Sequence, residues 1–386
     1  MEIHVLLPLA LIPAILLGEL GRKFGHPAVV GQIVAGFLLG PAALGILPAG
    51  SHEGDNGPAP GFFELADIGI CVLLFRVGLE TRLSEFVAVW KPATRVAIAG
   101  MVIPLALGTG AALALGWELS TAIFVGAALT ATSIGVTMSV LEESKAIHSR
   151  EGKIILGAAV LDDVLGLFLL SLMVAVVSPG AAVLPELAWA SVKAIGFLGA
   201  ALVIGPFVVK LTLAVCRWSG SQTILVVFAF AYLFMMSVAA QKSGLAMIIG
   251  AYAAGLAFAR HPSREELENE LKPFTELFTP LFFVVIGSSI TFGGFGSSAV
   301  LTLVVLTIAA ATGKILAAYV AGLKDVNRLV IGSGMTPRGE VGFVFANVAL
   351  GAGVLLAWQH AVLAVVLVFT TLAGPLLLRR SLGSRE

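Results

Sequence analysis

Long apolar segments joined by short polar connections make up almost the whole chain. Each segment approaches the ~20 residues that a helix needs to cross a bilayer. Only 12% of the 386 residues are charged, against roughly 25% in a soluble domain. We expect an all-α polytopic membrane protein, residues 1–386 forming one unit, because a helix satisfies its own backbone hydrogen bonds in lipid. Its 13 transmembrane helices would span 3–21, 27–48, 62–80, 93–115, 120–141, 153–178, 187–215, 221–240, 243–260, 273–292, 297–322, 328–351 and 358–379.

Lys and Arg residues are divided unequally between the two sets of connections. Alternate connections, beginning with the one after the first segment, hold most of the 23 basic residues, whereas the opposite connections hold only Lys242. Cytoplasmic connections of membrane proteins carry the excess of Lys and Arg. We therefore expect the N-terminus outside the cell and the C-terminus in the cytoplasm. The first segment lacks the basic stretch and cleavage site of a signal peptide.

Two neighbouring acids lie inside one of the most apolar segments. Asp162 and Asp163 interrupt the run from Ile154 to Val177, and Lys314 lies near the centre of segment 297–322. An ionised group near the bilayer midplane costs a few kcal/mol on insertion scales, so such residues usually face a partner or a water-filled cavity and carry function. We expect these three residues to belong to one functional site.

Two segments contain residues that do not suit a continuous helix. Leu129 to Thr137 reads LTATSIGVT, and Gly332 to Gly342 reads GSGMTPRGEVG, with Pro337 between two charged or polar neighbours. Irregular backbone at membrane depth is tolerated only inside protein or beside water. If both helices are interrupted, their ends present partial charges that Asp162 and Lys314 could neutralise. The alternative for TATS is a continuous helix whose hydroxyls bond to the preceding turn.

Short matching words indicate an internal repeat. GFLLG matches AYAAG, LLFRVG matches LFFVVIG, TGAAL matches TGKIL, GAALTATSIGVT matches IGSGMTPRGEVG, and VLDDVLG matches VFTTLAGP. Each match links one segment to the seventh segment after it, so the two copies run in opposite directions through the membrane. Inverted repeats are common in secondary transporters, whose binding sites lie near the midplane. We therefore expect two inverted repeats with crossed broken helices.

The motifs TATSIGVT, GAAVLDDVLGL, TGKIL and GMTPRGEVGF, in this order, resemble those of the monovalent cation:proton antiporters, especially bacterial sodium/proton antiporters of the NapA type. The resemblance implies an NhaA/NapA-like fold and a homodimer. A core ion-transport domain of residues 93–178 and 297–380 would slide, as an elevator, against a dimerisation domain of residues 1–92 and 221–292. Residues 187–215 would form the linker helix. The resemblance also implies a bacterial inner membrane.

The resemblance assigns roles to residues at matching positions. Asp163 would be the main cation ligand and proton carrier, Asp162 its neighbour, and Lys314 the partner of Asp162 when no cation is bound. Thr132 and Ser133 would line the site, and the transported Na⁺ would be held by Asp163, Asp162 and Thr132. Pro337, Arg338 and Glu340 would support the second broken helix.

These roles predict exchange of Na⁺ or Li⁺ for H⁺, because one site that cannot hold both ions couples their fluxes. A proton released by Lys314 would allow two protons per Na⁺, which makes the exchange electrogenic. Two alternatives stay open: a K⁺/H⁺ antiporter or K⁺ efflux system of the same family, and a same-fold Na⁺-coupled solute symporter. K⁺ efflux systems often append a nucleotide-binding domain, whereas this chain stops at Glu386, which favours the simpler antiporter.

Two classes of membrane enzyme also bury carboxylates. Intramembrane aspartyl proteases need aspartates on separate helices, whereas neighbours on one helix point about 100° apart. Prenyl transferases need further acids one turn on, where this chain has Val164, Leu165 and Gly166. We therefore expect a transporter rather than an enzyme, with the lipid bilayer, a monovalent cation and protons as partners, no nucleic acid and no cofactor.

Arg76, in LLFRVGLE, is a basic residue inside an apolar segment. Glu80 follows four residues later, so the simplest expectation is an ion pair between successive turns of one helix. The alternative is a role at the cytoplasmic entrance.

Overall fold

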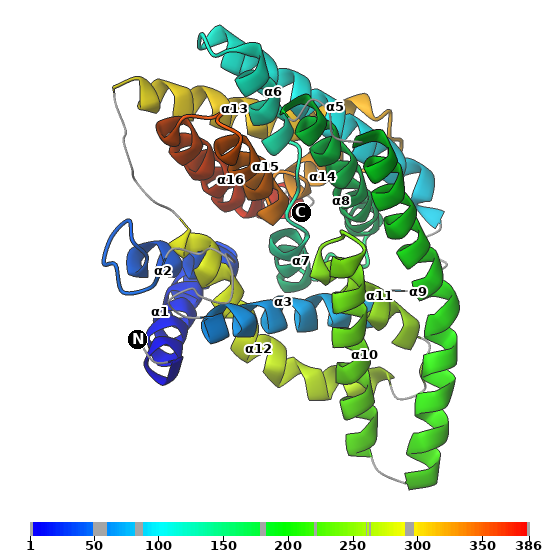
Figure 1. Ribbon diagram of the computed structural model, residues 1–386. Coiled ribbons are helices and arrows are strands. Elements are labelled where there is room, and N and C mark those ends of the chain that lie inside the picture. Colours follow the sequence, from blue (N-terminus) through cyan, green and yellow to red (C-terminus); the bar gives the residue numbers. More distant parts are fainter. Residues whose placement is uncertain are drawn as a thin grey trace.

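The computed structural model describes residues 3–48, 60–81, 88–177, 183–219, 222–259, 261, 264–289 and 297–383. Within these ranges every regular element is a helix (Figure 1). Six of these helices are long and apolar enough to cross a membrane: α1 (Ile3–Lys23), α5 (Trp90–Ala114), α10 (Gln222–Lys242), α12 (Arg264–Ser288), α13 (Ser297–Val320) and α16 (Ala357–Gly383). The chain is therefore an integral multi-pass membrane protein.

One set of helices, here called the α3 group, lies in the lower half of Figure 1. It consists of α1, α10, α12, α2 (Ala28–Leu39), α3 (Pro60–Glu80) and α11 (Met247–Phe258). Glycines let these helices approach closely, as is common when helices associate in lipid. A Cβ atom added at Gly255 of α11 would collide with the carbonyl oxygen of Phe75 in α3, and one at Gly36 of α2 would collide with that of Val284 in α12.

A second set, here called the α8 group, fills most of the upper half of Figure 1. It consists of α5, α13, α16, α6 (Leu119–Ala128), α7 (Ile134–Glu143), α8 (Arg150–Val177), α14 (Arg328–Gly334) and α15 (Glu340–Gly351). The long helix α9 (Val183–Ser219) contacts α8 of this group and α10 and α11 of the α3 group. In Figure 1 it runs along the right-hand side, beside both groups.

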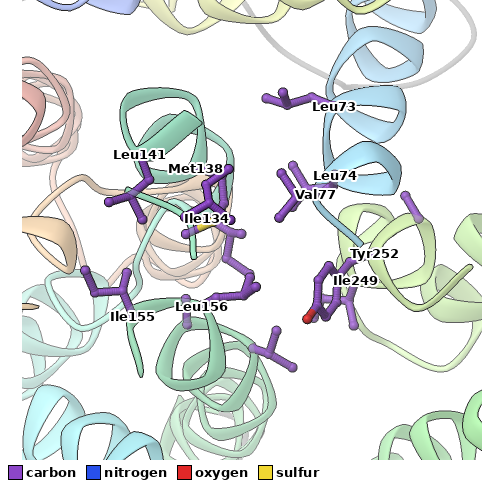
Figure 2. Close-up of a cluster of buried hydrophobic side chains, with 14 of the residues drawn as sticks. Leu73, Leu74, Val77, Ile134, Met138, Leu141, Ile155, Leu156, Ile249 and Tyr252 are labelled. Carbon is purple, nitrogen blue, oxygen red and sulfur yellow. The ribbon is translucent and has the colours of Figure 1, made fainter. Parts of the chain in front are cut away.

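The two groups meet across an apolar interface. Figure 2 shows part of the largest buried cluster, in which side chains of α3 and α11 face side chains of α7 and α8. The labelled residues are Leu73, Leu74 and Val77 of α3, Ile249 and Tyr252 of α11, Ile134, Met138 and Leu141 of α7, and Ile155 and Leu156 of α8. Apolar contacts are non-directional, so this interface does not by itself fix one relative position of the groups.

Two helices are interrupted where the sequence predicts. The first ends at Ala128 and resumes at Ile134, and the second ends at Gly334 and resumes at Glu340. Ser133 caps α7, its hydroxyl accepting a hydrogen bond from the backbone N–H of Val136. In the second interruption, Pro337 has no N–H to donate to a helix. The continuous-helix interpretation of TATS is therefore wrong, although Thr130 still bonds to the preceding turn through the carbonyl of Ala127.

Candidate ion-binding site

The two interruptions lie against each other and are joined by hydrogen bonds. The backbone N–H of Ser133 donates to the carbonyl of Pro337 at 2.8 Å. The hydroxyl of Thr137 donates to the carbonyl of Gly334 at 2.7 Å, and that of Thr132 to the carbonyl of Met335 at 3.4 Å. Each interruption thus supplies partners for backbone groups that the other leaves outside a helix. All of these groups are buried, as irregular backbone at membrane depth requires.

Lys314 of α13 and Asp162 of α8 form an ion pair beside this crossing. Their Nζ and Oδ2 atoms lie 3.1 Å apart, and only 1% of Lys314 and 3% of Asp162 are exposed. A glycine on the neighbouring helix α5 leaves space for the ammonium group, because a Cβ atom added at Gly100 would lie 3.2 Å from Lys314 Nζ. The pairing of Asp162 with Lys314 is the contact that the family resemblance implies.

Asp163 and Arg338 complete a buried group of four charged residues. Asp163 follows Asp162 on α8 and is 6% exposed. It interacts electrostatically with Lys314, and Arg338 interacts electrostatically with both Lys314 and Asp162. We call Asp162, Asp163, Lys314 and Arg338 the charged quartet. With all four ionised, two acids balance two bases, which removes the large penalty of an unpaired charge in a low-dielectric interior.

Arg338 links three parts of the α8 group. Its Nη2 atom donates to the carbonyl of Ala310 in α13 at 2.5 Å, and its Nη1 atom to the carbonyl of Ala131 in the first interruption at 3.3 Å. Its backbone N–H donates to the hydroxyl of Thr371 in α16, and that hydroxyl donates to the carbonyls of Arg338 and Leu367. A guanidinium suits this position because its fork of donors reaches several acceptors at once.

Of the other residues predicted to support the second interruption, one is described together with its surroundings and the other only by its backbone. Pro337 is buried and packs against α16, where a Cβ atom added at Gly374 would lie 2.5 Å from its Cγ atom. Glu340 begins α15, but its side chain lies outside the described residues. The prediction overlooked Thr371, although the matching words VLDDVLG and VFTTLAGP pair the two threonines of α16 with the two aspartates of α8.

The oxygen atoms near the crossing are of the kind that a hard cation prefers. The carboxylates of Asp162 and Asp163, the hydroxyl of Thr132 and nearby backbone carbonyls are potential ligands. Hard cations take carboxylate, carbonyl and hydroxyl oxygens in preference to sulfur or imidazole ligands. The arrangement can therefore hold either a small cation or protons, in a region enclosed by protein.

The expectation for Arg76 is wrong. Its guanidinium pairs with Glu142 of α7, at 3.1 Å, and with Glu268 of α12, at 3.9 Å, rather than with Glu80 on its own helix. Glu80 is hydrogen-bonded to Glu268 and lies 3.4 Å from Nε2 of His148. Glu142 and Glu268, which lie on neighbouring helices, are thus the ion-pair partners of Arg76 in place of Glu80.

A protein-family model described as "Sodium/hydrogen exchanger, transmembrane" matches residues 9–381 of this chain. The chain belongs to the sodium/hydrogen exchanger family. The exchanger is 33% identical to the high-affinity Na⁺/H⁺ antiporter NhaS3 of Synechocystis sp., over 94% of this chain and 86% of the relative. It is 30% identical to the Na⁺/H⁺-K⁺ antiporter GerN of Bacillus cereus, over 100% of this chain and 97% of the relative.

The fold of the exchanger is also that of a solved structure. The sodium proton antiporter MjNhaP1 from Methanocaldococcus jannaschii matches with a TM-score of 0.74, over 99% of this chain and 97% of that chain. The sequences are 17% identical, so this likeness concerns the fold. The predicted membership of the monovalent cation:proton antiporters is confirmed.

Proposed function

We propose that the exchanger carries Na⁺ or Li⁺ in one direction and H⁺ in the other, and that both use the charged quartet. The observation that carries this proposal is the 3.1 Å ion pair between Lys314 and Asp162, buried beside the crossing of two interrupted helices. Asp163 is the main cation ligand and proton carrier. Thr132 and Ser133 line the site, and Pro337, Arg338 and Glu340 support its second interrupted helix.

Charge balance explains how the two fluxes are coupled. With Asp163 protonated and the other three residues ionised, the quartet carries one net positive charge, and a Na⁺ that displaces the Asp163 proton leaves that charge uncompensated in a low-dielectric region. The site returns to neutrality when it releases a proton. Lys314 is the group that can do so, because Na⁺ takes its partner Asp162. Together with the proton displaced from Asp163, this gives two protons per Na⁺ and an electrogenic exchange.

Alternating access is proposed to arise from sliding of the two helix groups. Residues 93–178 and 297–380, which include almost all of the α8 group, move as the core domain. Residues 1–92 and 221–292, which include the α3 group, stay in place as the dimerisation domain, and residues 187–215, within α9, link the two. Because the shared interface is mostly apolar, sliding replaces one set of apolar contacts with another. The proposal includes 13 membrane crossings in two inverted repeats, a homodimer, and a bacterial inner membrane with the C-terminus in the cytoplasm.

Proteoliposomes that contain a pH-sensitive dye test the proposal directly. Addition of Na⁺ or Li⁺ to wild-type protein should dequench the dye, and Asp163→Asn should abolish the response. Asp325→Asn is the matched control, since Asp325 is exposed at a turn position with a φ of 57°, where asparagine is well tolerated. A full response from Asp163→Asn would exclude Asp163 as the carrier.

A second candidate is exchange of K⁺ for H⁺. It is favoured by the 30% identity to GerN, a relative named as a Na⁺/H⁺-K⁺ antiporter. In the same assay, a response to K⁺ but not to Na⁺ or Li⁺ would establish this candidate. An absence of response to all three cations, in correctly inserted protein, would instead favour a Na⁺-coupled solute symporter.

A further inference from the structure

The last turn of α7 is held by ion pairs that cross between the two helix groups. Arg76 of α3 lies 3.1 Å from Glu142 of α7 and 3.9 Å from Glu268 of α12, measured between guanidinium nitrogen and carboxylate oxygen. Arg76 is 8% exposed. The guanidinium therefore joins the second half of the first interrupted helix to two helices of the α3 group.

The neighbouring acid is bound from another side. Glu143 accepts hydrogen bonds from the backbone N–H of Ala28, at the beginning of α2, and from Nη1 of Arg379, both at 3.0 Å. It also lies 3.5 Å from Nε of Arg22. A carboxylate beside the first backbone N–H groups of a helix is further favoured by the helix dipole. The end of α7 is thus bound to α1, α2, α3 and α12 through two adjacent glutamates.

These ion pairs differ in kind from the rest of the contact between α3 and α7. Elsewhere the two helices face each other with apolar side chains of one buried cluster, among them Leu73, Val77 and Met138 (Figure 2). Apolar contacts are non-directional, so one set can replace another when helices slide past each other. An ion pair depends on distance and direction, so a displacement of α7 relative to α3 would break it.

Arg76 also balances a concentration of acids. Besides Glu142 and Glu268, Glu80 interacts electrostatically with Arg76, and Glu80 is hydrogen-bonded to Glu268. Among the described residues, the other basic groups facing these acids are His148, whose side chain is 60% exposed, and Lys272, whose side chain is 61% exposed. Loss of the Arg76 charge would leave carboxylates of α3, α7 and α12 repelling one another across the boundary between the groups.

We propose that Arg76 is a positioning residue for transport, which fastens the end of α7 to α3 and α12 and so favours the conformation described here over the alternative one. The inference rests on the proposed sliding of the two groups. We call the contact between Arg76 and Glu142 the α7 latch. The latch opens whenever the α8 group moves, so its strength sets the ratio of the two conformations and thereby the apparent affinity for Na⁺.

Cross-linking measures that ratio without any transport. A Cβ atom added at Gly135 of α7 would lie 2.5 Å from Cδ1 of Ile70 in α3, so Ile70→Cys with Gly135→Cys forms a reporter pair. Both native cysteines, Cys71 and Cys216, are replaced by alanine. The rate of disulfide formation under a mild oxidant then reports the fraction of molecules in which α3 and α7 are in the position described here.

Variants of the latch are compared in this background. Arg76→Gln and Glu142→Gln should each lower the ratio of the described conformation to the alternative one about fivefold, the effect of losing one partly buried ion pair on a two-state equilibrium, and the cross-linking rate should fall with the population of the described conformation. The effect of the double variant should be smaller than the sum of the two single effects, because the contact between Arg76 and Glu142 can be lost only once. Arg76→Lys should restore most of the rate, and Lys242→Gln, at an exposed residue in the last turn of α10, should leave it unchanged. An unchanged rate in Arg76→Gln and Glu142→Gln would overturn the proposal.

Transport kinetics distinguish a change in the position of α7 from a general loss of active protein. In proteoliposomes, Arg76→Gln should shift the apparent KM for Na⁺ at least threefold, because the population of the binding-competent conformation changes, and Arg76→Lys should reverse the shift. A lower maximal rate with unchanged KM and without rescue would contradict the latch. If Arg76→Gln does not fold, Glu142→Gln makes the same test. Absence of exchange in wild-type protein would refute the proposed function. The cross-linking result would still show whether the contact between Arg76 and Glu142 favours the described position of α7.

Discussion

The Nζ atom of Lys314 lies 3.1 Å from the Oδ2 atom of Asp162, although the two residues are 152 positions apart in the chain. Their helices, α13 and α8, both pack on α5, whose Gly100 leaves room for the ammonium group. The contact therefore depends on the packing of three helices. It is also the contact that cation binding is proposed to break.

Replacing Lys314 by glutamine should both destabilise the protein and remove transport currents. Breaking a buried ion pair costs about 3–5 kcal/mol, because the remaining charge stays uncompensated. The Tm in detergent should fall, and Lys314→Gln combined with Asp162→Asn should recover part of the loss. Currents from Lys314→Gln proteoliposomes as large as those of wild type would show that no proton from the lysine is required.

Thr371→Val should weaken the support of the second interrupted helix. It keeps the shape of the side chain but removes the hydroxyl that bonds to both the N–H and the carbonyl of Arg338. Leaving buried polar groups without a partner costs about 1–3 kcal/mol, so the Tm should fall. Thr312→Val is the control, since the hydroxyl of Thr312 is exposed and bonds only within its own helix. Equal melting curves for the two variants would contradict this role of Thr371.

Arg338→Lys should impair the site although it keeps the positive charge. A single ammonium group cannot reproduce the bonds from two guanidinium nitrogens to Ala310 and Ala131. The first interruption should then lose its tie to α13, and the apparent KM for Na⁺ should rise. Arg380→Lys, at an exposed residue of α16, should not change it. Na⁺-dependent exchange at several Na⁺ concentrations provides the comparison.

Gly255→Ala should separate α3 from α11. The added methyl group would meet the carbonyl oxygen of Phe75, and backbone cannot move aside as a flexible side chain can. Overpacking of this kind costs about 1–3 kcal/mol. Gly110→Ala, with nothing within 4 Å of the added atom, should instead leave stability unchanged or raise it by up to ~1 kcal/mol through helix propensity. The denaturation midpoint should therefore fall for Gly255→Ala and should not fall for Gly110→Ala.

Local chemistry predicted the two interruptions correctly. Pro337 and the glycines around it are incompatible with an uninterrupted helix. The pairing of Asp162 with Lys314 came instead from the family resemblance. Helix ends were predicted less well. Helix α12 begins at Arg264, whereas hydropathy predicts a span from 273, because its first residues, REELENELK, favour a helix without being apolar.

Arg76 shows what a sequence alone does not contain. Pairing with Glu80 depends only on helix geometry and could be read from the spacing. Pairing with Glu142 and Glu268 depends on which helices surround α3, and on the length of the arginine side chain, which can reach past its own helix. Thr371 was overlooked for the same reason, since its importance comes from the position of Arg338.

The neutrality of the charged quartet has an electrical consequence. With Asp163 and Lys314 both protonated, the four residues carry one net positive charge. With Na⁺ bound and both protons released, residues and ion together are neutral. In the proposed mechanism, a membrane potential of 100 mV, which is worth about 2.3 kcal/mol per elementary charge, would therefore act on the proton-loaded movement and not on the sodium-loaded one. The rate of only one half of the transport cycle, the proton-loaded movement, would depend on voltage.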